Sequence, residues 1–172
     1  RTKKPLFSNK VASYFKINDD IGMVEFHSKA NALDGESMKL LSDAIDHSEI
    51  NHRGMVIHND ASHFSCGVNL ERISDFIEVC DWDGLDAFLE HFQKTVKKMK
   101  YSSIPVISAP SGLSIGGGFE VVLHTDASIY HANSVTGLVE SLVGVVPGGG
   151  GVKEILYRWF DICLLYTSDA AD

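Results

Sequence analysis

The sequence predicts an α/β fold, and three observations support this. Short β-prone runs alternate along the chain with longer segments of helical periodicity. Glycine-bearing turns lie between several of these segments. The 172 residues are 44% hydrophobic and 9% aromatic, which is enough apolar material for one buried core. Alternation of strands and helices in a single domain implies crossover connections between the strands.

The first third of the chain contains one hairpin, one helix and one buried strand. Residues 1–9 are polar and basic, and we expect a linker there. The helix is indicated by one apolar face formed by Met38, Leu41, Ala44 and Ile45. In chain order, the predicted elements are the hairpin strands, a loop, the helix and the buried strand: 12–17 and 23–26, 31–34, 36–48, and 54–58.

The rest of the chain contains the strongest helical pattern. Residues 85–99 place six apolar side chains on one stripe: Leu85, Phe88, Leu89, Phe92, Val96 and Met99. Lysines in its last turns suit the negative end of the helix dipole. The other predicted elements are a loop, two strands and two helices: 64–69, 105–109, 128–130, 117–124 and 152–159.

Composition excludes several classes of function. Lys and Arg total 15 against 23 Asp and Glu, a net charge of −8, which argues against nucleic-acid binding. The three cysteines and eight histidines show no zinc or disulfide spacing, so we expect no metal, and Cys66 is expected to be a small core residue. No apolar run reaches about 18 residues and no signal peptide is visible, so we expect no membrane span and a cytoplasmic location.

Both ends of the chain are unusual. The chain begins with Arg1, and residues 163–172 resemble the translation of a transposase-type sequencing adapter. We therefore expect a domain at residues 10–162 that is incomplete at its C-terminal side, followed by an artefactual tail.

Two glutamates are the leading candidates for chemistry. Glu120 follows the run Gly116–Gly118, whose N–H groups at a helix start would bind an anion. Glu140 follows an apolar strand and Gly137, and apolar neighbours would raise its pKa. Two carboxylates beside an oxyanion site are suited to acid–base chemistry next to a carbonyl. An exposed first-turn glutamate and an edge glutamate are the ordinary structural alternatives.

Three other motifs compete with this interpretation. Residues 112–116 fit the G-x-S-x-G nucleophile elbow around Ser114, but the later acid and histidines are crowded together: His124, Asp126 and His131. The run Gly148–Gly151 is not followed by Lys-Ser or Lys-Thr, so it is not a phosphate-binding P-loop. No G-x-G-x-x-G follows a strand, so nothing indicates dinucleotide binding.

Taken together, six motifs resemble the crotonase superfamily, the enoyl-CoA hydratase/isomerase fold. They are residues 31–33, 64–70, 104–106, 115–120, 137–140 and 144–148. Their order and spacing match over roughly residues 10–159. The resemblance implies a ClpP-like ββα superhelix that stops before the C-terminal helices of the family.

A finer resemblance is to the hydratase segment of bacterial multifunctional 3-hydroxyacyl-CoA dehydrogenases. It rests on residues 25–28, 99–102, 137–141 and 147–151. In that arrangement NAD belongs to a separate dehydrogenase segment, so no cofactor is expected in this one. Residues 1–9 would then be the inter-domain linker.

The resemblance implies a role for each site residue. The N–H groups of Val68 and Gly117 would bind the acyl-thioester oxygen, although a smaller alanine is common at position 68. Glu120 would act as base toward water and Glu140 as acid toward the α-carbon, with a concerted sharing of both roles equally open. The acyl-CoA site would be lined by Lys29, Ala30, Ala32, Ser65, Cys66, Gly67, Gly116, Pro147 and Gly148.

The implied function is enoyl-CoA hydration, a lyase reaction of fatty-acid β-oxidation. Because both glutamates are present, hydratase is favoured over the isomerase alternative of the same fold. A serine hydrolase using Ser114 and a non-catalytic crotonase-fold binding protein remain as further alternatives. The complete protein is expected to form a homo-oligomer, and the chain itself to have little activity without the C-terminal helices.

Overall fold

A six-stranded mixed sheet forms the base of the computed structural model, which describes residues 4–168 except for the side chains of 162 and 164–168. Its strand order is β1-β2-β3-β4-β5-β7. The pairs β1–β2 and β2–β3 are antiparallel, and the pairs β3–β4, β4–β5 and β5–β7 are parallel. Their bounds are Phe7–Ser8, Ala12–Lys16, Ile21–Phe26, Gly54–Ile57, Val106–Ser108 and Ala127–Ser128. A separate parallel pair consists of β6 (Leu113–Ile115) and β8 (Val135–Gly137).

The predicted hairpin is confirmed. Strands β2 and β3 pair with Ala12 opposite Phe26, and alternate residues of β3 are buried. Asn18 closes the turn by accepting the N–H groups of Asp20 and Ile21. The expected linker at residues 1–9 contains strand β1, which pairs with β2. Its Phe7 also stacks on Tyr14, with ring centroids 4.9 Å apart.

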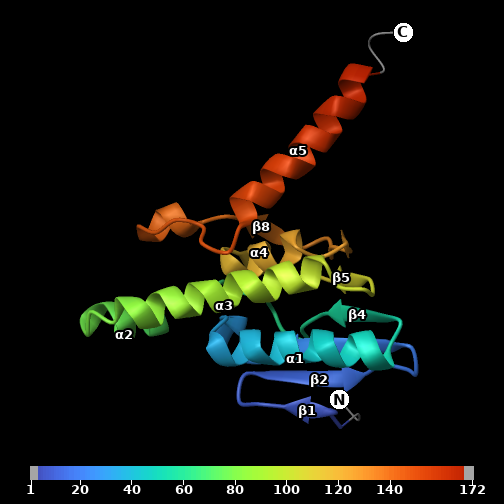
Figure 1. Cartoon of the computed structure of the whole chain (residues 1–172), viewed down its shortest axis with the longest axis horizontal. Coiled ribbons are helices and arrows are strands. Elements are labelled where there is room, and N and C mark those ends of the chain that lie inside the picture. Colours follow the sequence, from blue (N-terminus) through green and yellow to red (C-terminus); the bar gives the residue numbers. More distant parts are fainter. Residues whose placement is uncertain (1–3, 169–172) are drawn as a thin grey trace.

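Helix α1 (Gly35–Asn51) packs against the sheet (Figure 1). It starts at Asp34, whose carboxylate accepts the Ser37 N–H while the Ser37 hydroxyl accepts the Asp34 N–H. The predicted apolar face is confirmed, because all four of its residues are fully buried: Met38, Leu41, Ala44 and Ile45.

Helix α3 (Trp82–Lys100) packs on α1 and contains the predicted stripe. Its C-terminal half is buried through Phe92, Val96 and Met99, whereas its N-terminal half is only partly covered. Helix α2 (Leu70–Glu78), which was not predicted, lies beside that N-terminal half and has no buried residue (Figure 1).

The remaining elements position the candidate site. They are two short 3₁₀ turns and two helices: η1 (Lys29–Asn31), η2 (Glu140–Val143), α4 (Gly117–Leu123) and α5 (Gly151–Ser168). The helix predicted at 117–124 is confirmed, and the one predicted at 152–159 lies within the longer α5. The strand predicted at 128–130 is observed as β7, Ala127–Ser128, and beyond it the Ile129 N–H still donates to the Ser108 carbonyl of β5 at 2.9 Å.

Helix α5 extends away from the sheet at the C-terminal end (Figure 1). Its backbone continues through residues 163–168, which the sequence assigned to the artefactual tail, and residues 169–172 of that tail lie outside the described residues. None of the helices in the described range is long and apolar enough to cross a membrane.

Candidate active site

Glu120, in the first turn of α4, is the most buried carboxylate of the candidate site, with 2% of its surface exposed. Its Oε1 accepts the Gly149 N–H at 2.9 Å and the Gly151 N–H at 3.0 Å, and Oε2 lies 3.0 Å from the Gly149 nitrogen. Gly151 is the first residue of α5. The carboxylate therefore sits at the positive end of the α5 dipole, where N–H groups have no partner within the helix.

The glycine run before α5 is what allows this approach. A Cβ atom on Gly149 would collide with Oε2 of Glu120 and with the ring of Phe92. A Cβ atom on Gly151 would lie 2.8 Å from Cγ of Glu120. The Gly148–Gly151 run, which does not match a P-loop, thus donates hydrogen bonds to a carboxylate of the same chain.

Three influences act on the pKa of Glu120. Burial is the largest and raises the pKa, and the negative charge of Glu140 also raises it. The hydrogen bonds from Gly151 and Gly149 oppose both, but the pKa stays above its ordinary value. Such a carboxylate is a stronger base than a solvated one when it is ionised.

Glu140 begins η2 and is partly buried. A Cβ atom on Gly116 would lie 3.4 Å from Oε1 of Glu140, and Oε2 is buried with no hydrogen-bond partner in the described part of the chain. The expected apolar enclosure is absent on one side, because the flanking Leu142 and Val143 are 84% and 56% exposed. The short turn directs these two side chains to solvent while it turns Glu140 toward Gly116.

Two backbone N–H groups lie next to this pair of carboxylates. Gly116 has φ 53°, which turns the chain from β6 into α4 and leaves the Gly117 N–H at the helix start. A Cβ atom on Gly117 would be 3.4 Å from the Val68 nitrogen, so the two predicted donors are neighbours. Neither N–H has an acceptor within residues 4–168. This is the arrangement expected of an oxyanion hole.

The segments expected to line an acyl-CoA site lie side by side. The Cys66 N–H donates to the Ala30 carbonyl at 3.1 Å, and the Leu33 N–H donates to the Gly67 carbonyl at 2.8 Å. The Gly67 N–H donates to Ser65 Oγ at 3.1 Å. Burial raises the pKa of the Cys66 thiol, as expected for an unreactive cysteine.

The remaining predicted substrate residues are distributed around this pair of segments. Lys29 begins η1 and Ala32 follows its end, and Gly116 lies beside Glu140, whose Oε1 is 3.4 Å from the place of a Cβ atom there. Pro147 and Gly148 lie near α3, since the Gly148 carbonyl accepts from Gln93 Nε2 at 2.6 Å. Contact of these residues with a substrate stays a prediction.

Ser114 is placed poorly for nucleophilic attack. It lies in the middle of β6, is fully buried, and its Oγ has no partner among the described residues. The residue with positive φ, which would be the nucleophile of an elbow, is Gly116 instead. Without an exposed hydroxyl or a histidine partner, the geometry does not support a serine hydrolase.

Sequence reasoning missed three charged or polar residues near Glu120: Lys100, His124 and Glu154. The available signals were helical spacings. His124 follows Glu120 by four positions on α4, and Glu154 lies in the first turn of α5. Each of these two residues is 3% exposed, and a glutamate is rarely buried so deeply unless it is paired.

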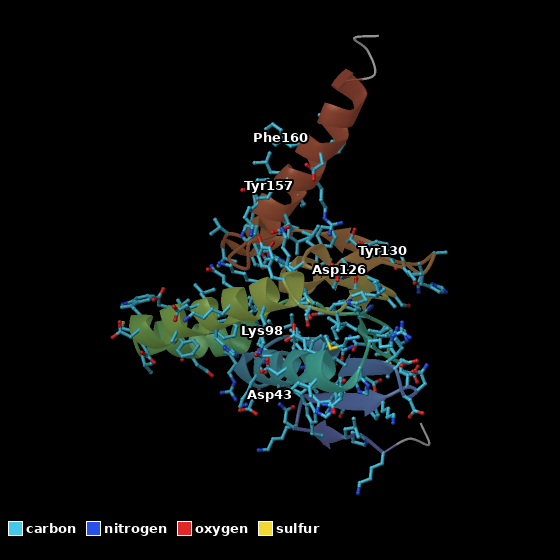
Figure 2. The ribbon with its side chains drawn as sticks, turned by 45° about the vertical axis from the view of Figure 1, so that its right-hand side comes forward. Asp43, Lys98, Asp126, Tyr130, Tyr157 and Phe160 are labelled. Carbon is cyan, nitrogen blue, oxygen red and sulfur yellow. The ribbon has the colours of Figure 1, made fainter. Side chains whose placement is uncertain are left out.

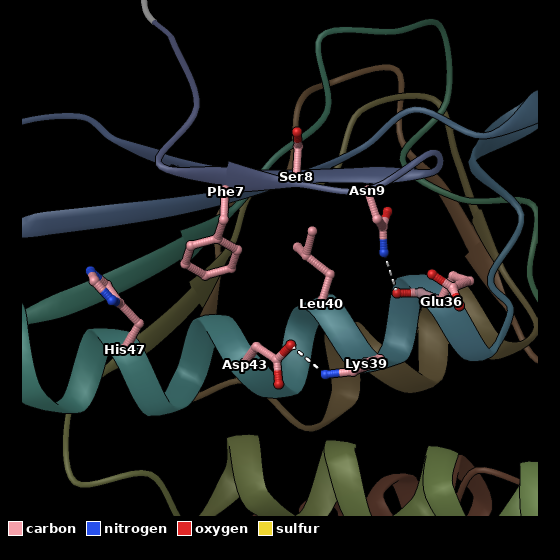
Figure 3. Close-up of a pocket in the computed structure, with 8 residues that line it drawn as sticks. All are labelled: Phe7, Ser8, Asn9, Glu36, Lys39, Leu40, Asp43 and His47. Carbon is pink, nitrogen blue, oxygen red and sulfur yellow. Dashed lines mark hydrogen bonds and ion pairs between the residues drawn. The ribbon is translucent and has the colours of Figure 1, made fainter.

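A separate hollow lies between β1 and α1 (Figure 3). It has a volume of about 450 Å³ and is lined by Phe7, Ser8, Asn9, Glu36, Lys39, Leu40, Asp43 and His47. Its Lys39 is already paired with Asp43 at 2.7 Å, so the hollow offers no free charge on that side. Across residues 4–168, no three metal-ligating side chains gather at one point.

Comparison with known proteins adds independent findings. A family model described as Enoyl-CoA hydratase/isomerase matches residues 16–159. The chain is 37% identical over 154 residues to a probable 3-hydroxyacyl-CoA dehydrogenase of Bacillus subtilis, covering 90% of this chain and 20% of the relative. It is 32% identical over 131 residues to a putative fatty acid oxidation complex trifunctional enzyme of Rickettsia felis, covering 76% and 18%. The chain thus spans about a fifth of these relatives.

Solved structures agree on the fold. An enoyl-CoA hydratase from Polaromonas sp. JS666 superposes with a TM-score of 0.77 at 24% identity, covering 81% of this chain and 55% of that one.

Proposed function

The chain belongs to the enoyl-CoA hydratase/isomerase family, the crotonase superfamily, and from this membership we propose that it adds water to 2-enoyl-CoA thioesters. The observation that supports hydration most directly is the buried carboxylate of Glu120. It is held by two amides, it is close enough to Glu140 for that charge to raise its pKa, and it lies beside two outward N–H groups.

The paired N–H groups would polarise the substrate. The thioester oxygen accepts hydrogen bonds from Val68 and Gly117, and these bonds strengthen as negative charge develops on that oxygen in the enolate. Their positions are fixed by the backbone rather than by flexible side chains, which limits reorganisation during the reaction.

The two glutamates would then handle protons. Ionised Glu120 takes a proton from the water whose oxygen bonds to the β-carbon, and protonated Glu140 gives a proton to the α-carbon. The sum is addition of one water molecule, with no oxidant or reductant. The same geometry also serves a concerted transfer in which both carboxylates act on a single water.

The product carries a hydroxyl group at C3, which is the group that a 3-hydroxyacyl-CoA dehydrogenase oxidises. Because one relative has that name, we propose that this chain is the hydratase segment of a longer fatty-acid-oxidation polypeptide. Acyl-CoA binding through residues 29–32 and 65–68 is part of the same proposal.

The test is hydration of crotonyl-CoA in ¹⁸O-labelled water by the complete polypeptide that contains this chain. Label at C3 of the product is expected. In Glu120→Gln and in Glu140→Gln, turnover should fall at least ~10²-fold while acyl-CoA binding changes much less. Near-normal turnover in either variant would overturn the roles assigned here.

The same assay separates hydratase from isomerase. An isomerase would convert a 3-enoyl-CoA to the 2-enoyl isomer with no ¹⁸O in the product. Isomerisation that exceeds hydration would assign the chain to the isomerase branch of its family.

A further inference from the structure

A group of charges around the buried Glu154 connects α3 with α5 one helical turn from Glu120, and His124 of α4 packs beside it. The Glu154 carboxylate is its centre, and its side chain is 4% exposed. Lys100 of α3 lies 2.6 Å from Oε2, and Lys153 lies 2.8 Å from Oε1. His124 of α4 approaches the same Oε1 with Nε2 at 3.5 Å.

Helices α4 and α5 meet along one line through this group. Residues three or four positions apart share a helix face. Thus Glu120 with Gly151 makes the first contact, a hydrogen bond, and His124 beside Glu154 makes the second, a packing contact with Nε2 3.5 Å from Oε1. A third follows at Arg158, which donates to the carbonyls of Leu123 at 2.9 Å and Thr125 at 3.3 Å.

The protonation states follow from the contacts. His124 Nδ1 lies 2.7 Å from the backbone carbonyl of Glu120, which can only accept, so Nδ1 carries the hydrogen. Burial is the largest influence on His124 and holds its pKa below the ordinary value, so the ring is neutral at pH 7. Burial alone would raise the pKa of Glu154, but the hydrogen bonds from Lys100 and Lys153 outweigh it and the pKa is lowered.

We propose that Glu154 and Lys100 are positioning residues, which fix the first turn of α5 from α3 and so keep the Gly149 and Gly151 N–H groups on the Glu120 carboxylate. The inference rests on the proposed function only in treating Glu120 as catalytic. An ionised Glu154 anchored from α3 fixes α5 three residues after Gly151, at the turn that supplies the donors.

Other charged groups face this region and remain in every variant below. Glu140 of η2 acts on Glu120 directly. Around the network, a hollow of about 230 Å³ is also lined by Asp126, Tyr157, Arg158 and Asp161. A change in the pKa of Glu120 must therefore be assigned by comparing two kinds of variant. One kind shortens the Glu154 side chain, and the other removes its charge.

The principal variant is Glu154→Asp, which keeps the negative charge but shortens the side chain by one methylene. Amide hydrogen exchange of a peptide spanning Gly149 and Gly151 is measured by mass spectrometry on the 172-residue chain. We expect these amides to exchange about tenfold faster, as for the loss of one hydrogen bond to a charged acceptor. Glu90→Asp is the matched control, since Glu90 makes an exposed 2.8 Å pair with Lys94 on α3.

Glu154→Gln separates positioning from simple charge. Removal of a nearby negative charge would by itself lower the pKa of Glu120, whereas loss of its amide donors raises it. Infrared titration of the carboxyl band that disappears in Glu120→Gln follows this pKa. We expect a higher pKa in both Glu154 variants and parental behaviour in Lys100→Arg, which keeps a cation for Glu154.

An unchanged midpoint in Glu154→Asp with a lowered one in Glu154→Gln would overturn the proposal. If the Glu154 variants do not fold, the exchange measurement on Lys100→Met replaces them. Faster exchange of the two glycines then supports the proposal, and unchanged exchange rejects it. These readouts need no turnover. If the chain shows them but the complete polypeptide does not hydrate enoyl-CoA, the proposed function alone is rejected, and a complete polypeptide that is a normal hydratase while the chain lacks them rejects the positioning role alone.

Discussion

At the scale of single residues, the site combines a buried carboxylate with backbone donors. Glu120 is held by amides of Gly149 and Gly151, while Val68 and Gly117 leave their N–H groups without an acceptor in the described chain. The hydrogen bonds to Glu120 offset part of the free-energy cost of burying its carboxylate. The N–H groups of Val68 and Gly117 are available to bind a ligand. Both arrangements depend on glycines. Gly149 and Gly151 have no room for a Cβ atom, and Gly116 has a positive φ.

The Gly117 donor can be removed by proline, although a contact with Val68 must then shift. Gly117 is the first residue of α4, where an N–H has no helical partner, but a Cβ atom there would lie 2.9 Å from Cγ2 of Val68. Gly117→Pro should lower kcat for enoyl-CoA hydration by ~10²–10³. Circular dichroism of the variant checks that the fold is retained.

Ser114→Ala is the control for that experiment. The Ser114 hydroxyl is buried and unpartnered in the described part of the chain, so its removal should leave turnover unchanged and stability equal or slightly higher. An inactive Ser114→Ala enzyme beside an active Gly117→Pro enzyme would favour the hydrolase alternative.

Glu120 should also limit stability at neutral pH. Because its pKa is raised in the folded state, the folded chain binds more protons than the unfolded chain between the two pKa values. Stability from this group is thus present below the unfolded pKa and is lost as pH rises through the folded one. Glu120→Gln should raise Tm at neutral pH, by roughly 2–4 °C per kcal/mol gained.

Differential scanning fluorimetry across pH 4 to 8 measures this effect, and the gap between parent and variant should close toward the acidic end. A variant that is less stable than the parent at every pH would show that the hydrogen bonds of the carboxylate outweigh its burial.

At the scale of elements, the start of α5 is fitted to α4 through its glycines. Gly149→Ala places a Cβ on the Glu120 carboxylate and on Phe92, so one of them must move. We expect a loss of about 1–3 kcal/mol in the free energy of unfolding, typical of overpacking, together with a strong loss of hydration. Chemical denaturation and turnover are measured on the same samples.

Gly35→Ala is the matched control, because a Cβ there meets no atom within 4 Å. It should leave both stability and activity close to those of the parent. Equal effects of the two substitutions would show that the contact between Gly149 and Glu120 is not what constrains the loop.

The elements that could be predicted from the sequence are those with a full period. Helices α1 and α3 have apolar faces of several turns, and the β2–β3 hairpin has a turn signal. Strands β1, β6 and β8 have two or three residues, too few to show a period of two. Helix α2 buries none of its residues, so no core-facing pattern distinguishes it from a loop.

The candidate site divides in the same way. Glycines beside Glu120 and Glu140 are local signals, and they indicated both carboxylates. The Gly149 and Gly151 donors lie 29 and 31 positions from Glu120. The Lys100–Glu154 pair spans 54 positions. No local pattern encodes such pairings, because they depend on how α5 docks.

At the scale of the whole molecule, the C-terminal region exposes many apolar side chains. Figure 2 shows Tyr157 and Phe160 projecting from the side of α5. More than 40% of the surface is exposed for each of nine residues: Leu142, Val143, Val145, Val146, Val152, Leu156, Tyr157, Trp159 and Phe160. Such a concentration favours association.

We therefore expect the 172-residue chain to associate as its concentration rises. Size-exclusion chromatography with light scattering should show a mass above 18.8 kDa. Trp159→Glu with Phe160→Glu should reduce that mass, whereas Ile50→Glu, on an isolated exposed residue of α1, should not. A monomer at all concentrations would show that this surface is tolerated in water.

The docking of Gly151 on Glu120 also has a consequence for synthesis on the ribosome. Glu120 is made 31 residues before the amide that completes its cradle. At a translation rate of about 5–20 residues per second, Gly151 is added about 2–6 s after Glu120. During this interval the nascent chain already contains the residues of α4 but not the two N–H groups that hold the Glu120 carboxylate. The candidate site is consequently among the last parts of the described domain to be completed, after the sheet strands and α1 have all been translated.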